Sequence, residues 1–163
     1  MPDKQSGKPP AFSLKSILVP LDGSVFGEAA LPCATELART SGAQVVLMQA
    51  VTPHHLEIDL AETRSPRLAR LSEEYMEHAA AAARSYLAGV QKRLSESGLA
   101  VRTVVEEGQA AEAILACARN NAADMIALST RGRSGIGVLV MGSVANKVLH
   151  SAEVPVLLVK PRS

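Results

Sequence analysis

Residues 17–24 read Ile-Leu-Val-Pro-Leu-Asp-Gly-Ser, and this run gives the strongest indication of the architecture. It is continuously apolar and ends in Asp-Gly-Ser, a combination typical of turns. A strand that is apolar on both sides belongs inside a sheet that is covered by helices on each face. The run therefore predicts a buried parallel strand over residues 16–21, followed by a helix that Ser24 would cap.

The same unit recurs along the chain. Further apolar runs predict strands at residues 45–51, 99–105, 124–128 and 155–159, with helical periodicity between them. Strands that alternate with helices imply an α/β domain with an open, mostly parallel five-stranded sheet and helices on both faces. We expect one domain over residues 14–163, preceded by a disordered tail over residues 1–13. In such a sheet, ligands bind outside the carboxyl ends of the strands.

Two of the predicted helices carry apolar stripes that we expect to face the sheet. In the first helix the stripe consists of Phe26, Ala30, Cys33 and Leu37. In a long helix after residue 66 it consists of Leu68, Leu71, Tyr75, Ala79, Ala82, Tyr86 and Val90. The chain has two cysteines, Cys33 and Cys117, and we expect both to be buried free thiols because no Cys-x-x-Cys spacing is present.

Composition disfavours two classes of partner. The net charge is +1, with 17 basic and 16 acidic residues, and aromatic residues make up 2% of the chain. Nucleic-acid binding usually needs a basic field and often aromatic stacking platforms, so we expect no nucleic-acid partner. Residues 1–10 are polar, and no apolar run is long enough to span a bilayer. We therefore expect a cytoplasmic protein with no membrane partner.

The richest candidate site is residues 129–143, which read Ser-Thr-Arg-Gly-Arg-Ser-Gly-Ile-Gly-Val-Leu-Val-Met-Gly-Ser. This segment leaves a strand end and enters a helix. Glycines let the backbone approach a ligand closely, and a helix start offers unpaired N–H groups and the positive end of the dipole. Gly132, Gly142 and Ser143 are thus candidate phosphate contacts, and Arg133 is a further candidate. The P-loop lysine and the dinucleotide glycine spacing are both missing.

This segment resembles the nucleotide-binding signature of the universal stress protein family, which reads Gly, two residues, Gly, nine residues, Gly, then Ser or Thr. Gly132 and Gly142-Ser143 match it, while Ser129 stands at the position of the first glycine. The resemblance runs from residue 16 to residue 160 and includes the opening run and the last helix and strand. It implies an adenine-nucleotide α-hydrolase-like sheet with strand order 3-2-1-4-5.

The resemblance also implies a ligand and its contacts. The ligand would be ATP, with Asp22 beside the ribose and phosphates and able to hold Mg²⁺ through water. The family's other nucleotide-binding positions fall at Pro20, Ala50, Val51, Leu128 and Val144, with Ala50 and Val51 where the adenine ring is held.

The expected function is a stress-response regulator that holds ATP with slow or no hydrolysis, since no base and no P-loop lysine accompany the loop. By resemblance we expect a homodimer paired through Val156–Val159, and a protein partner of unknown identity. Three alternatives remain open: an interaction module that binds no nucleotide, which the serine at position 129 leaves open; a slow ATPase; and a member that binds a cyclic nucleotide.

Overall fold

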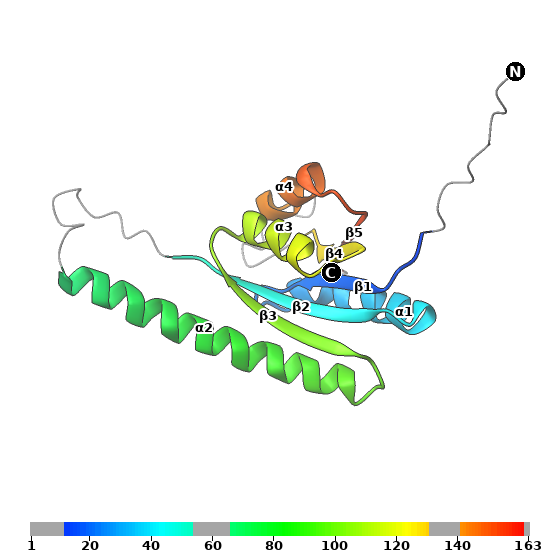
Figure 1. Cartoon of the computed structure of the whole chain (residues 1–163), viewed down its shortest axis with the longest axis horizontal. Coiled ribbons are helices and arrows are strands. Elements are labelled where there is room, and N and C mark those ends of the chain that lie inside the picture. Colours follow the sequence, from blue (N-terminus) through cyan, green and yellow to red (C-terminus); the bar gives the residue numbers. More distant parts are fainter. Residues whose placement is uncertain (1–11, 54–65, 131–140, 162–163) are drawn as a thin grey trace, which may run out of the picture.

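The computed structural model describes residues 12–53, 66–130 and 141–161. Within them lies one five-stranded sheet in which every pairing is parallel, with the order β3-β2-β1-β4-β5 (Figure 1). The strands are β1 (Ser16–Pro20), β2 (Gln44–Val51), β3 (Val101–Glu107), β4 (Met125–Ser129) and β5 (Val156–Val159). The expected α/β class and strand order are confirmed. The expected tail over residues 1–13 lies almost entirely outside the described residues.

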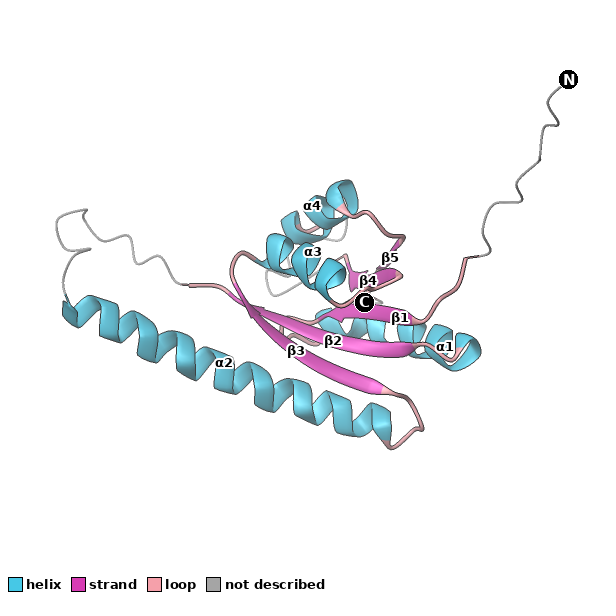
Figure 2. Ribbon diagram, viewed as in Figure 1, coloured by secondary structure: helices cyan, strands magenta, loops and turns pink. Residues whose placement is uncertain are grey.

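Helices cover both faces of the sheet (Figure 2). On one face, a 3₁₀ turn η1 (Gly27–Ala30) leads into α1 (Leu31–Ser41), and α2 (Pro66–Ser95) lies beside it. On the other face lie α3 (Ala110–Asn120) and α4 (Ser143–Ser151). Each face has its own aliphatic core, so the sheet is the middle layer of three.

The central strands supply side chains to both cores in alternation. Ile17 and Val19 of β1 belong to the core with α1 and α2, whereas Leu18 belongs to the core with α3 and α4. All three side chains have 0% exposure. Burying an aliphatic side chain of this size contributes about 1.5–3 kcal/mol. The continuous apolar run is therefore explained by burial on both sides.

The first helix presents a face to the sheet that overlaps only in part with the expected one: Ala30 is buried and Leu37 packs against the core, as expected. Leu31 and Ala34 are buried, whereas Phe26 is 41% exposed and Cys33 is exposed. The reason is η1, because a 3₁₀ turn has three residues per turn and changes the phase of the helix that follows. The expectation that Phe26 and Cys33 belong to the core was wrong.

The long helix α2 packs on the sheet only through its second half. Leu87 and Val90 are almost fully buried there, in agreement with the expectation for Val90. Leu71 and Tyr75 are 50% and 45% exposed, so their assignment to the core was wrong. Figure 1 shows the reason: the first half of α2 runs past the strands and has no sheet beneath it.

Candidate functional site

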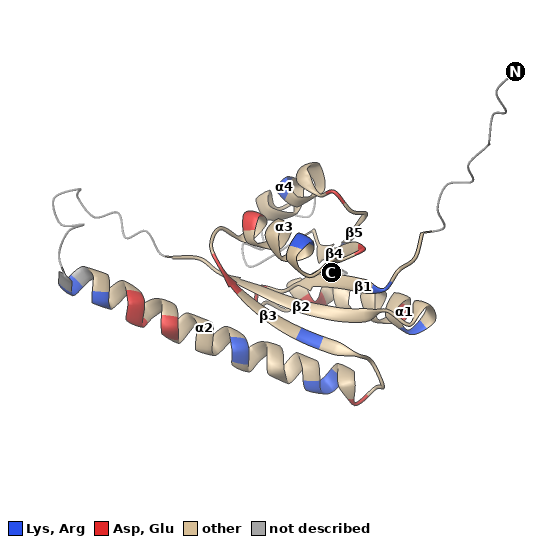
Figure 3. Ribbon diagram, viewed as in Figure 1, with Lys and Arg blue, Asp and Glu red and all other residues tan. Residues whose placement is uncertain are grey.

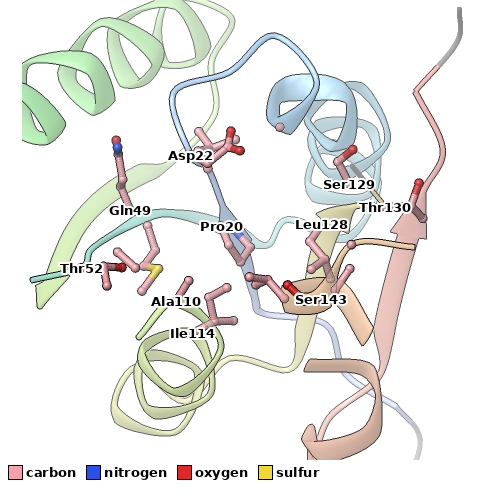
Figure 4. Close-up of a pocket in the computed structure, with 17 residues that line it drawn as sticks. Pro20, Asp22, Gln49, Thr52, Ala110, Ile114, Leu128, Ser129, Thr130 and Ser143 are labelled. Atoms are coloured by element: carbon pink, nitrogen blue, oxygen red, sulfur yellow. The ribbon is translucent and has the colours of Figure 1, made fainter. Parts of the chain in front are cut away.

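A cavity of about 380 Å³ lies at the carboxyl edge of the sheet (Figure 4). The ends of β1, β2 and β4 and the first residues of α3 and α4 form its walls. β1 lies in the middle of the sheet, with β2 on one side of it and β4 on the other. The chain adds β2 and β3 in one direction from β1 and then adds β4 and β5 in the opposite direction, so the strand order reverses beside β1. Open parallel sheets place ligands at such a reversal, and the volume lies within the range of small-molecule sites.

Most residues expected at the site line this cavity. Those among the described residues are Pro20, Asp22, Ala50, Leu128, Ser129, Gly142, Ser143 and Val144. Val51 is also described but does not line the cavity; it is 6% exposed, and its carbonyl accepts a hydrogen bond from Gly108 N at 2.9 Å. Gly132 and Arg133 lie outside the described residues.

The start of α4 forms one end of the cavity. Gly142 N donates to Thr130 O at 3.0 Å, which ties the end of β4 to the helix start. No described side chain caps α4. The first N–H groups of a helix have no partner within the helix, so those of Ser143 and Val144 suit an anion.

Gly142 is not required by backbone conformation, because its φ of −59° suits any residue. A Cβ placed there would have Thr130 O as its nearest neighbour, at 3.5 Å, an ordinary contact. Glycine at this position therefore leaves space beside the helix start without being needed for the fold. A glycine that leaves space but is not needed for the backbone conformation is typical of a place where a ligand approaches the backbone closely.

Asp22 holds the turn after β1 as well as lining the cavity. Its Oδ1 accepts hydrogen bonds from Ser24 N at 2.9 Å and from Ser24 Oγ at 2.6 Å. Ser24 Oγ in turn accepts from Gly27 N at 3.0 Å, so Ser24 satisfies the first N–H of η1. Ser24 was expected to cap the following helix, but no described side chain caps α1, and Ser24 instead accepts from the first N–H of η1.

A second link connects this turn to α2. Tyr86 Oη donates to Glu28 Oε1 at 2.9 Å, and Arg93 donates to Glu28 Oε2 at 2.9 Å. Burial raises the pKa of Tyr86 well above its ordinary value, and the hydrogen bond to Glu28 and the negative charges of Glu28 and Asp22 act in the same direction. The Tyr86 hydroxyl therefore stays a donor, and η1 stays docked against α2.

The sequence analysis did not single out Gln49, which lines the cavity from β2. Gln49 is 8% exposed, and its Oε1 is buried with no hydrogen-bond partner among the described residues. A buried amide oxygen without a donor is unusual in a protein. The available signal was a single amide residue near the end of a strand that is otherwise apolar, flanked by Met48 and Ala50.

Charge is sparse around the cavity. Asp22 is the only ionisable side chain among the described lining residues. No cluster of three metal-ligating side chains occurs in the part of the chain that the structure describes. Along α2, Figure 3 shows basic side chains toward both ends of the helix and acidic side chains between them. Within residues 12–53, 66–130 and 141–161, no helix combines the length and apolar character needed to cross a membrane.

An open parallel sheet with a ligand-sized cavity where the strand order reverses defines a class, the doubly wound α/β domains that bind ligands at their strand ends. Comparison with known proteins narrows that class. The model of the universal stress protein family matches residues 13–160, and this chain belongs to that family.

Curated relatives support the same membership. Universal stress protein MJ0531 of Methanocaldococcus jannaschii is 31% identical over 146 residues, which cover 90% of this chain and 82% of the relative. A universal stress protein of Thermus aquaticus is 33% identical over 148 residues, covering 90% of this chain and 98% of the relative.

Solved structures agree on the fold. The protein MJ0577 superimposes with a TM-score of 0.81 at 22% identity, covering 93% of this chain and 99% of the other. A universal stress protein in complex with cAMP has a TM-score of 0.57 at 20% identity, covering 92% of this chain and 99% of the other. A third, from Archaeoglobus fulgidus in complex with dAMP, has a TM-score of 0.56 at 17% identity, covering 91% and 99%.

Proposed function

We propose that this chain binds ATP in the cavity at the ends of β1, β2 and β4, and that it acts in the cytoplasm as a stress-response regulator. The observation that carries the proposal is the junction of the cavity with the start of α4, where Gly142 leaves space and no described side chain caps the helix. Family membership supports it, as do the adenine nucleotides named for two fold relatives.

The phosphates would lie at the α4 end of the cavity. Backbone N–H groups at the helix start, the Ser143 hydroxyl and the positive end of the helix dipole together suit a polyphosphate. Ser129 at the end of β4 and Thr130, which follows it, also line the cavity. In Figure 4, Ser129 and Thr130 lie on the side of the close-up opposite Gln49 and Thr52.

The base would lie at the other end. Ala50 at the end of β2 and Ala110 and Ile114 at the start of α3 line that part of the cavity with apolar side chains. Small aliphatic groups on both sides leave room for a flat ring and exclude water from its faces. In the proposed pose Leu128 and Val144 complete the apolar wall toward the phosphates.

Mg²⁺ is compatible with the residues present when it arrives with the nucleotide. Magnesium is usually held by one or two carboxylates together with substrate phosphates and water, and it needs no protein cage. Asp22 would be that carboxylate, held in place by its bonds to Ser24. When bound, the ion would neutralise phosphate charge.

We expect the site to hold ATP with slow or no turnover. Asp22 is the single ionisable group among the described lining residues, and its Oδ1 already accepts hydrogen bonds from Ser24. Phosphoryl transfer requires a positioned nucleophile and charge stabilisation at the γ-phosphate. A nucleotide that is held without rapid turnover suits a regulator, whose occupied and empty forms a protein partner would distinguish.

We further propose a homodimer formed through β5. This strand is at the edge of the sheet, paired with β4 alone among the described strands. All four of its residues, Val156–Val159, are apolar and only partly buried. An apolar edge strand is a liability in solution, and pairing with the same strand of a second copy would cover it.

The test uses two glycine variants. Gly142→Ala fits the fold but places a methyl group beside the proposed phosphates, so we expect it to lose at least tenfold in ATP affinity by calorimetry. Gly89→Ala is the matched control, because Gly89 is exposed in α2 with open space around its Cα, and binding should be unchanged. Mass spectrometry of material released by denaturation would identify the nucleotide carried. Equal ATP affinity in Gly142→Ala and the wild type would contradict the proposed site, and preferential binding of cyclic AMP would replace ATP as the ligand.

A further inference from the structure

The segment after β1 connects the cavity to α2. At its start, Asp22 lines the cavity, and further on Glu28 of η1 is bonded to α2. Gly27 lies between them: its N–H donates to Ser24 Oγ at 3.0 Å, and a Cβ on it would clash with Asp22 Oδ1. A shift of η1 would therefore displace the groups that surround the Asp22 carboxylate.

Both carboxylate oxygens of Glu28 are held by α2. Tyr86 Oη donates to Oε1 at 2.9 Å, and Arg93 Nη2 donates to Oε2 at 2.9 Å. Tyr86 and Arg93 are seven residues apart, which is two helical turns, so both lie on one face of α2. Because the Arg93 side chain is 61% exposed, solvent screens its ion pair, and the half-buried Tyr86 bond is the firmer of the two.

The link reaches the cavity without a direct contact from α2. No residue of α2 is among the described residues that line the cavity. The charge of Asp22 nevertheless adds to the raised pKa of Tyr86, so the hydroxyl lies within electrostatic reach of that carboxylate. An effect of α2 on a bound molecule would be indirect, and η1 is bonded to α2 on one side and to the Asp22 turn on the other.

We propose that Glu28 is a positioning residue, which α2 holds in place so that η1 keeps the Asp22 carboxylate at the nucleotide. The inference rests on the proposed function and gives the same site a link to α2. Coupling of this kind is reciprocal, so nucleotide bound at Asp22 also favours the docked position of η1 on α2. A protein partner could then distinguish the occupied from the empty form on a helix that does not line the cavity.

The experiment is a double-mutant cycle on the affinity of the full chain for magnesium-ATP, measured by calorimetry. Tyr86→Phe removes one bond to Glu28 without changing any charge, and it should weaken binding about threefold. Asp22→Asn keeps an oxygen for Ser24 to donate to but removes the carboxylate charge. In the Asp22→Asn background Tyr86→Phe should cause no further loss of affinity. Its effect on the urea midpoint should be similar in both backgrounds.

Two further variants separate this role from a general loss of stability. Glu28→Ala removes both bonds to α2 and should weaken binding, although losing a negative charge would by itself favour an anionic ligand. Gln91→Met is the matched control, because Gln91 Nε2 donates to Val101 O at 2.9 Å and so joins α2 to the start of β3, remote from the cavity. It should lower the urea midpoint about as much as Tyr86→Phe does and leave the affinity unchanged.

Each other outcome overturns the inference. Equal losses of affinity from Tyr86→Phe in both backgrounds, or no loss in either, would show that Tyr86 does not act through Asp22. Tighter binding by Glu28→Ala, or a threefold loss in Gln91→Met, would contradict it as well. If Asp22→Asn binds too weakly to measure, Gly27→Ala takes its place in the cycle, since it displaces the same carboxylate. Wild-type protein that binds no magnesium-ATP overturns the proposed function itself, and this inference with it.

Discussion

Gly27 packs so closely against Asp22 that a Cβ on residue 27 would clash with the Asp22 Oδ1 atom. The same oxygen accepts both hydrogen bonds from Ser24, and Ser24 Oγ accepts from Gly27 N. Gly27 is itself buried in η1. The turn after β1 is thus closed around one carboxylate oxygen, and the carboxylate is fixed at the edge of the cavity.

Replacing Gly27 with Ala should disturb both stability and binding. The Asp22 side chain would have to rotate away, and losing its two bonds to Ser24 should cost about 2 kcal/mol. Urea unfolding measures that loss, and calorimetry should show weaker ATP binding because Asp22 has moved. Gly89→Ala is the control and should gain up to about 1 kcal/mol, as an exposed helix glycine does. A Gly27→Ala protein as stable as the wild type would show that the turn adapts without cost.

The hydrogen bond between Tyr86 and Glu28 should contribute measurably to stability. Tyr86→Phe removes the hydroxyl and leaves the ring in place between α2 and η1, so we expect a loss of about 1 kcal/mol at neutral pH. Urea midpoints of the variant and the wild type measure the difference.

The same bond should weaken in alkali. Because the folded-state pKa of Tyr86 is raised, its extra stability is fully present below the ordinary tyrosine pKa of about 10 and is lost as the pH rises above it. The stability difference between the wild type and Tyr86→Phe should therefore be constant at about pH 8 and shrink toward about pH 11. A difference that grows with pH would contradict the sign of this pKa shift.

The architecture was predictable because its signals are local. The runs around Ile17 and Val45 are apolar on both faces, and only buried parallel strands satisfy them. Because the carboxyl ends of parallel strands meet at one edge, the strand ends were the expected place of the site. The family resemblance supplied the apolar positions Pro20, Ala50, Leu128 and Val144. Resemblance to a family supplied the strand order, which local periodicity does not contain.

The wrong or missing predictions concern features that depend on tertiary structure. Periodicity placed Leu71 and Tyr75 in the core, but it does not say where the sheet ends beneath α2. The phase of α1 depends on η1, whose closure needs the Asp22–Ser24 contact. Gln49 was overlooked because the sequence does not show whether a buried oxygen has a hydrogen-bond partner. Only the structure shows that the Gln49 Oε1 atom has none among the described residues.

The two thiols should react at very different rates. Cys33 is exposed on α1, whereas Cys117 is buried in α3, where burial raises its pKa to about 11, with the nearby Glu106 charge adding to the effect. A disulfide reagent at about pH 8 should therefore modify one thiol per folded chain quickly and the second only after unfolding. Cys33→Ala should abolish the fast phase. Two fast thiols in the folded protein would contradict the burial of Cys117.

The end of α3 contains strain that one substitution should relieve. Ala122 has φ 45°, the left-handed conformation in which glycine is favoured after a helix. Ala123 N donates to Ala118 O at 2.9 Å and Ala122 N to Arg119 O at 3.1 Å, so the turn is fixed by its own bonds. Ala122→Gly should stabilise the protein by about 1 kcal/mol in urea unfolding. Ala88→Gly, at an exposed position within the second half of α2, is the matched control and should destabilise it by about 1 kcal/mol. Equal losses in the two variants would mean that the conformation at Ala122 carries no strain.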